Sequence, residues 1–228
     1  LQLGLSKGGV ELMVIGIEEM LHAFREHGLI EIAADMSNMF NALQHGGPNG
    51  VFEEVDKLQL IRDLIPVYLA LYKFGFLLFG KQKDGMLKQM VRGASGVRQG
   101  NQLSSAGACV ATHQLVVDAN EMVKLDGKPG MVRAYADNIY IIGTPENAFK
   151  ALDYVTEQQK TRLDIDNNPR ESFVYIPPNV SDAQAAIATQ MAEQRDFVVS
   201  RVGIKVLGYT LDNRPKRKNL CALELQRA

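Results

Sequence analysis

The stretch that decides the fold is MVRAYADNIYIIG at residues 131–143. Residues that favour strands stand on both sides of the pair Asp137-Asn138, which suits a tight turn between two antiparallel strands. The stretch therefore predicts a β-hairpin that carries Asp137 at its tip.

A second acid ends another predicted strand. The apolar run LIEIAAD at residues 29–35 has strand length and closes with Asp35. If the two strands are neighbours in one sheet, both carboxylates project from the same edge, where they would offer the oxygen ligands that Mg²⁺ requires. The alternative is that each acid serves only a turn or a helix cap.

The rest of the chain mixes predicted helices with short strands. Helices are expected over residues 10–27, 37–44, 103–124, 145–161 and 181–195, with two more inside 51–79, and further strands over 173–176 and 204–211. Ser37 or Asp35 is expected to cap the short second helix, and Asp84-Gly85 is expected to form a hairpin turn. This order predicts an α+β fold in which an antiparallel sheet packs on helices that cover one face.

Segments from residue 2 to residue 211 resemble, in order, the motifs of reverse transcriptases. YADN at 135–138 is similar to their Tyr-x-Asp-Asp box, and GVRQGNQLSS at 96–105 resembles Gly-Val-Arg-Gln-Gly-Asp-Pro-Leu-Ser-Pro. AADMSNMFNAL at 33–43 resembles the motif that carries a metal-binding acid, Asp-x-x-Asn-Ala-Phe-Asn. VLGYTL at 206–211 resembles the hairpin that grips the primer, and QLGLSKGG at 2–9 resembles a segment of the fingers. These motifs are most similar to those of non-LTR retrotransposon and group II intron enzymes. The resemblance extends to a degenerate or domesticated member of that group.

The resemblance implies a reverse-transcriptase-like palm that performs RNA-templated DNA synthesis by two-metal nucleotidyl transfer. In that family Asp35 and Asp137 would hold two Mg²⁺ ions, and Asn138 stands where the box has its second acid. Asn138 can still offer a carbonyl oxygen but removes one negative charge. Phe40 matches the aromatic gate that excludes the ribose 2′-hydroxyl, with a core phenylalanine on a short helix as the alternative.

The resemblance also implies residues that bind nucleotide. Gln99 would contact the incoming nucleotide or the template, and Arg98 and Gly100 would shape its loop. Arg170, in PRES at 169–172, stands where the family has a lysine; it keeps the positive charge but does not readily donate a proton.

A basic run lies near the end of the chain. It comprises Arg214, Lys216, Arg217 and Lys218 within RPKRK. Such a run suits phosphates, and a solvated terminal tail is the alternative.

The resemblance divides the chain into three parts. Residues 1–28 would form a partial fingers helix, and residues 29–213 a palm with a helical fingers insertion at about 46–95. Residues 214–228 would form the basic C-terminal tail, with no thumb after the palm.

Composition narrows the class of protein. A chain of 228 residues that is 46% hydrophobic can bury a substantial core, which excludes a disordered protein. Two cysteines and four histidines form neither a disulfide framework nor a closed zinc site, so we expect an intracellular, reducing compartment, either nucleus or mitochondrion. The apolar stretch 65–79 is too short for a membrane span and contains Lys73, so no membrane partner is expected.

Two functions from different classes remain open. The first is an active polymerase whose partners are an RNA template and a DNA primer. The second is a domesticated, inactive palm that serves as an RNA-binding or structural subunit among the RNA and proteins of a ribonucleoprotein. The net charge of −1 favours the second, as do Asn138 and the pair Asn101-Gln102 in place of Asp-Pro. The first is favoured by residues that a scaffold does not need, namely Asp35, Phe40, Gln99 and Asp137.

Overall fold

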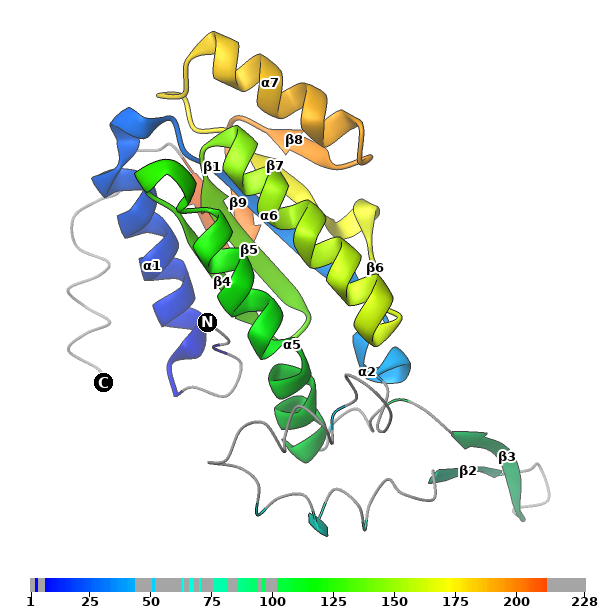
Figure 1. The fold of residues 1–228 in the computed structure, drawn as a ribbon. Helices are drawn as coiled ribbons and strands as arrows, with labels where there is room; N and C mark the ends of the chain where they lie inside the picture. The colour runs from blue at the N-terminus through cyan, green and yellow to red at the C-terminus, as the bar shows by residue number, and fades with distance from the viewer. Residues whose placement is uncertain are drawn as a thin grey trace.

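The computed structural model describes Leu3 and residues 7–43, 51, 63, 66–67, 70, 76–81, 86–93, 96 and 102–212. Its main element is a sheet of order β4-β5-β1-β7-β8, in which β6 also pairs with β1 (Figure 1). The strands are β1 Ile30–Ser37, β4 Met131–Tyr135, β5 Asn138–Gly143, β6 Asp166–Asn167, β7 Phe173–Tyr175 and β8 Val198–Ser200. The pairings are antiparallel except that of β7 with β8, which is parallel.

Three helices cover one face of this sheet. They are α5 Gln102–Met122, α6 Pro145–Gln158 and α7 Asp182–Glu193. Strand side chains alternate between faces, and Ile30, Ile32, Ala34 and Met36 of β1 join the core on this side. The predicted α+β architecture, an antiparallel sheet packed on helices, is confirmed.

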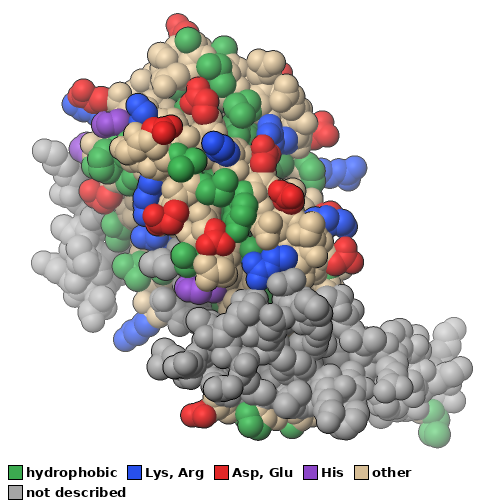
Figure 2. Space-filling view, in the orientation of Figure 1, with side chains coloured by type: hydrophobic (Ala, Val, Ile, Leu, Met, Phe, Trp, Pro, Cys, Tyr) green, Lys and Arg blue, Asp and Glu red, His purple; other side chains and the backbone are tan. Residues whose placement is uncertain are grey.

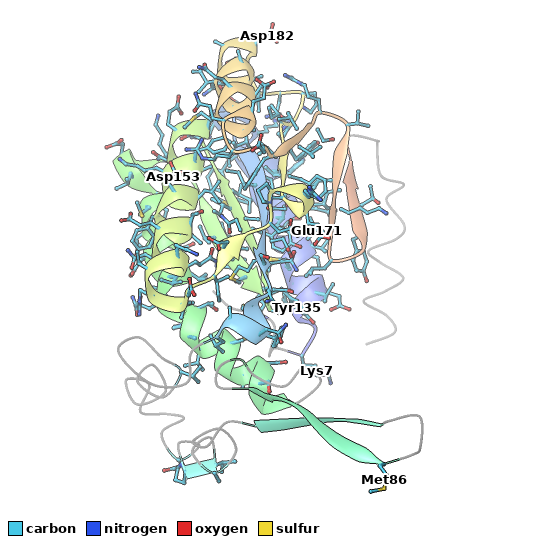
Figure 3. All side chains as sticks on the ribbon, turned by 90° about the vertical axis from the view of Figure 1, so that its right-hand side faces the viewer. Lys7, Met86, Tyr135, Asp153, Glu171 and Asp182 are labelled. Atoms are coloured by element: carbon cyan, nitrogen blue, oxygen red, sulfur yellow. The ribbon has the colours of Figure 1, made fainter. Side chains whose placement is uncertain are left out.

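A second core lies on the opposite face of the sheet. It is covered by α1 Gly9–Ala23 and by the hairpin of β9 Gly203–Val206 and β10 Tyr209–Asp212 (Figure 3). Ala33, Tyr140 and Ile142 point into this core, so the sheet is apolar on both faces and needs cover on both. The expectation that helices cover one face only is therefore wrong for the helix at residues 10–27.

The helices predicted over 10–27, 37–44, 103–124, 145–161 and 181–195 are present with shifted ends. After α1, residues Arg25–His27 form a 3-10 turn, and α6 continues as a π-helical turn over Gln159–Leu163. The short helix α2 spans Met39–Ala42 and begins after Asn38, which has a left-handed backbone and no capping side chain. The prediction that Ser37 or Asp35 caps this helix is wrong, because both residues belong to β1.

The strand predictions need more correction. Residues 204–211 form two strands rather than one, because Leu207 and Gly208 take φ values of 49° and 92° in a tight turn. Likewise β2 Phe76–Lys81 and β3 Leu87–Gly93 pair as a hairpin, where a helix was expected to extend to residue 79. The predicted turn at Asp84-Gly85 lies between these strands and outside the described residues. Most of the predicted helical insertion at 46–95 also lies outside them.

Membrane insertion has no support from the helices of the described ranges. None of them combines the length with the apolar character that a bilayer span requires.

Candidate active site

The turn between β4 and β5 carries the first candidate acid. Tyr135 pairs with Asn138, so the two turn residues are Ala136 and Asp137, one position earlier than the sequence suggested. Ala136 has a φ of 52°, a positive value at the first central position of the kind that type II′ turns require. Asn138 is consequently the first residue of β5.

The second candidate acid lies on the neighbouring strand. Asp35 of β1 lies directly opposite Asn138 in the antiparallel register, and the Met36 N–H donates to the Asp137 carbonyl at 2.9 Å. Opposed residues in such pairs have Cα atoms about 4.5–5.5 Å apart. Asp35 shares its side of β1 with Glu31 and Ala33, which is the face turned away from α5 and α6. The structure therefore brings Asp35, Asp137 and Asn138 to one end of the sheet.

The electrostatics of Asp35 reflect this crowding of acids. Burial first, and then the charges of Asp137 and Glu171, raise the pKa of Asp35 to about 6. A hydrogen bond between the Glu171 and Asp35 carboxyl groups also raises this pKa, whereas a hydrogen bond from Asn168 lowers it. A positive ion at this position would relieve the repulsion among the carboxylates.

Asn138 makes a neutral contact with its neighbour. Its Nδ2 donates to Asp137 Oδ1 at 3.1 Å, so the amide orients this carboxylate without adding charge. The Asn138 amide oxygen was expected to replace a carboxylate oxygen as a ligand, and this expectation stays a prediction.

The two carboxylates suit one type of Mg²⁺ site, in which phosphate and water complete the coordination, and not a site enclosed by protein ligands. Asp35 and Asp137 supply hard carboxylate oxygens, and Mg²⁺ in nucleotide sites is commonly held by one or two carboxylates together with water and phosphate oxygens. In the described ranges no group of three or more Asp, Glu, His or Cys residues is placed to hold a metal. The pair therefore fits an ion that arrives with a phosphate ligand rather than one enclosed by protein.

Residues 168–172, where the sequence indicated only Arg170 in PRES, contact Asp35. Asn168 and Ser172 make hydrogen bonds with it, and Glu171, labelled in Figure 3, lies on the 3-10 turn Pro169–Glu171 between them. These residues are more than 130 positions from Asp35 along the chain, so no local pattern indicates the contact. The sequence signal was the PRES segment at 169–172 itself, but it drew attention to Arg170 rather than to Glu171 or Ser172.

Of the remaining predicted residues, Phe40 and Arg170 are described and the others lie outside the described ranges. Phe40, on α2, is half-buried against the core beneath α5 and α6. Arg170 is exposed, and no described contact joins it to Asp35. The residues outside the described ranges are Arg98, Gln99, Gly100, Arg214, Lys216, Arg217 and Lys218.

Gly96, three positions before Gln99 in the sequence, lies beside α2. The Gly96 N–H donates to the Leu43 carbonyl at 2.8 Å, and a Cβ at Gly96 would lie 2.6 Å from the Asn41 carbonyl oxygen. With a φ of 83° as well, this position requires glycine. Gly96 is thereby held against the helix that follows β1.

Comparison with known proteins gives similarity of structure alone. No family model and no curated protein matches the sequence. Telomerase from Candida albicans in complex with the TWJ fragment of telomeric RNA matches 92% of this chain and 34% of that chain, with a TM-score of 0.63 and 12% identity. Apo telomerase from Candida tropicalis matches 92% of this chain and 36% of that chain, with a TM-score of 0.61 and 12% identity. A form of the latter truncated from its C-terminal domain matches 76% of this chain and 35% of that chain, at a TM-score of 0.56 and 12% identity.

Telomerase is a reverse transcriptase, and this chain spans about a third of the length of these telomerase chains. The chain thus has the α+β fold of a reverse-transcriptase-like palm.

Proposed function

We propose that this chain is the palm of an RNA-directed DNA polymerase. The observation that carries the proposal is the placement of Asp35 opposite Asn138, beside the turn that holds Asp137. The telomerase from Candida albicans was solved with a fragment of telomeric RNA, which supports RNA as a partner. The DNA primer and the polymerase activity belong to the proposal.

In this proposal the chain's own residues hold and orient the reacting groups. Asp35 and Asp137 would bind Mg²⁺, and Asn138 would keep the Asp137 carboxylate in place through its hydrogen bond. Bound Mg²⁺ would supply charge stabilisation at the attacking and leaving oxygens of nucleotidyl transfer. Because the pKa of Asp35 is about 6, most Asp35 side chains are ionised at neutral pH. The carboxylate can therefore bind a metal ion without first giving a proton to a base.

Other residues would bind the nucleic acid and the nucleotide. Gln99, with Arg98 and Gly100, would contact the nucleotide or the template, and Phe40 would act as the gate. These residue roles are supported by the similarity of the motifs to those of non-LTR retrotransposon and group II intron enzymes. The likeness to the telomerase structures does not support them.

A second candidate is an inactive palm within a ribonucleoprotein. Asn138 favours it, because a neutral amide stands where the family's box has an acid. The mixed surface in Figure 2, where Lys and Arg alternate with Asp and Glu, also lacks the strongly basic character of a free-standing nucleic-acid-binding domain.

Primer extension on an RNA template separates the two functions. With Mg²⁺ or Mn²⁺, the wild-type chain should extend a DNA primer, and Asp137→Asn should abolish extension because it removes a ligand charge while keeping the side-chain shape. Asn138→Asp should extend as well as the wild type or better. The matched control is Asp182→Asn on the exposed start of α7, which should change nothing.

A filter-binding titration with the same RNA completes the experiment. Asp137→Asn should bind RNA as the wild type does, because phosphate contacts dominate nucleic-acid affinity and the loss of an acid does not weaken them. Wild-type chain that binds RNA but extends no primer with either metal would favour the inactive palm.

A further inference from the structure

The edge of β1 beside Asp35 has an interrupted partner strand. β7 pairs with β1 from Glu31 to Ala33, and β6 pairs with Met36 and Ser37. Between these two ladders, residues 168–172 leave the sheet through a 3-10 turn. Interruptions of this kind occur beside active sites, where they redirect side chains.

Residues 168–172 replace the missing ladder with a closed set of hydrogen bonds. The Asp35 N–H donates to Ser172 Oγ at 3.1 Å, and the Ser172 hydroxyl donates to the Asn168 carbonyl at 2.8 Å. The Asn168 N–H in turn donates to the Asp35 carbonyl at 2.9 Å. Both backbone groups of Asp35 are therefore held from this side, with a serine side chain in the place of a backbone carbonyl.

The same segment reaches the carboxylate. Asn168 Nδ2 donates to Asp35 Oδ2 at 3.4 Å. Ser172 itself is fully buried, so its hydroxyl has no access to water as an alternative partner. A continuous strand would satisfy the backbone of Asp35 equally well, but it would not bring Asn168 and Glu171 to the carboxylate.

We propose that Asn168 and Ser172 are positioning residues that fix Asp35 for metal binding in the polymerase reaction. Ser172 would fix the backbone of Asp35, and Asn168 would fix the orientation of its carboxylate. The inference rests on the proposed function for its role in catalysis. Its effect on metal binding is measurable without catalysis.

The test measures the binding of Mn²⁺ alone to the full chain, by the broadening of amide signals around Asp35 and Asp137 in NMR spectra. Residues that hold a metal ligand from behind commonly change affinity or activity about 10–100-fold when replaced. Ser172→Ala and Asn168→Ala should each weaken Mn²⁺ binding by at least about tenfold on that basis. Ser172→Thr keeps the hydroxyl and should restore binding close to that of the wild type.

The matched control is Ser181→Ala. Ser181 Oγ accepts a hydrogen bond from the Gln184 N–H at the start of α7, so this variant also loses a bond between a serine hydroxyl and the backbone, but away from Asp35. It should bind Mn²⁺ as the wild type does. Asn168→Ala keeps every backbone bond of the segment, and it decides the question if Ser172→Ala does not fold.

The outcomes separate this inference from the proposed function. If the variants weaken Mn²⁺ binding as expected but no form extends a primer, the positioning role stands and the polymerase proposal falls. If the wild type extends a primer and folded Ser172→Ala and Asn168→Ala bind Mn²⁺ and extend as it does, the positioning role is overturned. A wild-type chain that neither binds Mn²⁺ nor extends a primer overturns both.

Discussion

Glu31 is a fully buried acid in the middle of the sheet. Its side chain has 0% exposure, and neither carboxyl oxygen has a hydrogen-bond partner among the residues that the structure describes. It lies on β1 between Ile142 of β5 and Tyr175 of β7, facing the core under α1. Burial raises the pKa of Glu31 from 4.5 to about 8, because a charged carboxylate loses its hydration there. At neutral pH the folded chain therefore carries Glu31 mostly as the neutral acid.

This buried acid predicts a stability that falls as pH rises. The folded chain keeps a proton on Glu31 that the unfolded chain releases above its ordinary pKa of 4.5, so the stabilisation is complete below 4.5 and is lost as the pH passes through about 8. The slope from one proton is at most ~1.4 kcal/mol per pH unit. Urea unfolding between pH 6.5 and 8 should show this slope in the wild type and a flatter one in Glu31→Gln.

The control for Glu31 is Glu26→Gln on the exposed 3-10 turn after α1, which should keep the wild-type slope. Asp35 contributes little in this range, since its pKa is about 6. Equal slopes in the wild type and Glu31→Gln would mean that Glu31 is ionised in the folded chain.

Single residues differ in how far the sequence could predict them. The position of Asp35 near the end of a strand and that of Asp137 in a turn follow from local patterns, although β1 continues past Asp35 to Ser37 and the turn lies one residue earlier than predicted. Asn168 and Ser172 meet Asp35 only through the pairing of distant strands, so no local spacing indicates them. The burial of Glu31 could not be predicted either. The run LIEIAAD predicts a strand, but it does not show that both faces of that strand are covered.

At the scale of elements, α5 depends on small side chains. Its residues Ala108, Ala111 and Ala119 are buried in the core, and the helix contacts β4 and α6. Gly107 is buried as well, whereas Ala106 is half-buried at the edge of this contact. Small residues at such positions allow a helix to approach its neighbours closely, and a larger side chain must displace them.

Gly107→Leu should therefore lower the free energy of unfolding by roughly 1–3 kcal/mol through overpacking. Chemical denaturation measures the loss. The control is Gln114→Leu on the exposed side of the same helix, which should change stability by less than about 0.5 kcal/mol. A Gly107→Leu variant as stable as the wild type would mean that this part of α5 does not pack against its neighbours.

The long helices were predicted, whereas the short strands β6 and β8 were missed. The helices α5, α6 and α7 have clear starts and stops in the sequence, with Pro145 opening one and Ser181 capping another. The strands β6 and β8 have two and three residues, too few to show an alternating pattern. The strand pattern did not show the turn at Leu207-Gly208, because the residues around it continue an apolar run, whereas the resemblance of VLGYTL at 206–211 implied a hairpin there.

At the scale of the whole molecule, the sheet divides two cores of different composition. The helical side packs aliphatic side chains of α5, α6 and α7, while the other side contains Tyr140, Tyr175 and Glu31 beneath α1 and the β9–β10 hairpin. Both candidate acids lie at the end of β1 and its neighbouring turn. With a net charge of −1 and mixed charges on the face in Figure 2, the chain has no general attraction for phosphates, so the proposed RNA binding requires local clusters of positive charge.

The basic run of Arg214, Lys216, Arg217 and Lys218 is the densest such cluster in the sequence. Replacing all four residues with Gln should weaken binding to single-stranded RNA and make it less sensitive to salt. Each phosphate contact contributes about 0.7 to the slope of log K against log salt, so the slope should fall in magnitude by up to roughly 3. Filter-binding titrations between about 50 and 200 mM salt measure this slope.

A control that replaces four exposed lysines changes the net charge equally and should leave the slope nearly unchanged. These lysines are Lys124, Lys128, Lys150 and Lys160. If both variants lose RNA affinity equally, binding depends on total charge rather than on the basic run. If the variant without the basic run loses no affinity, the run is a solvated tail.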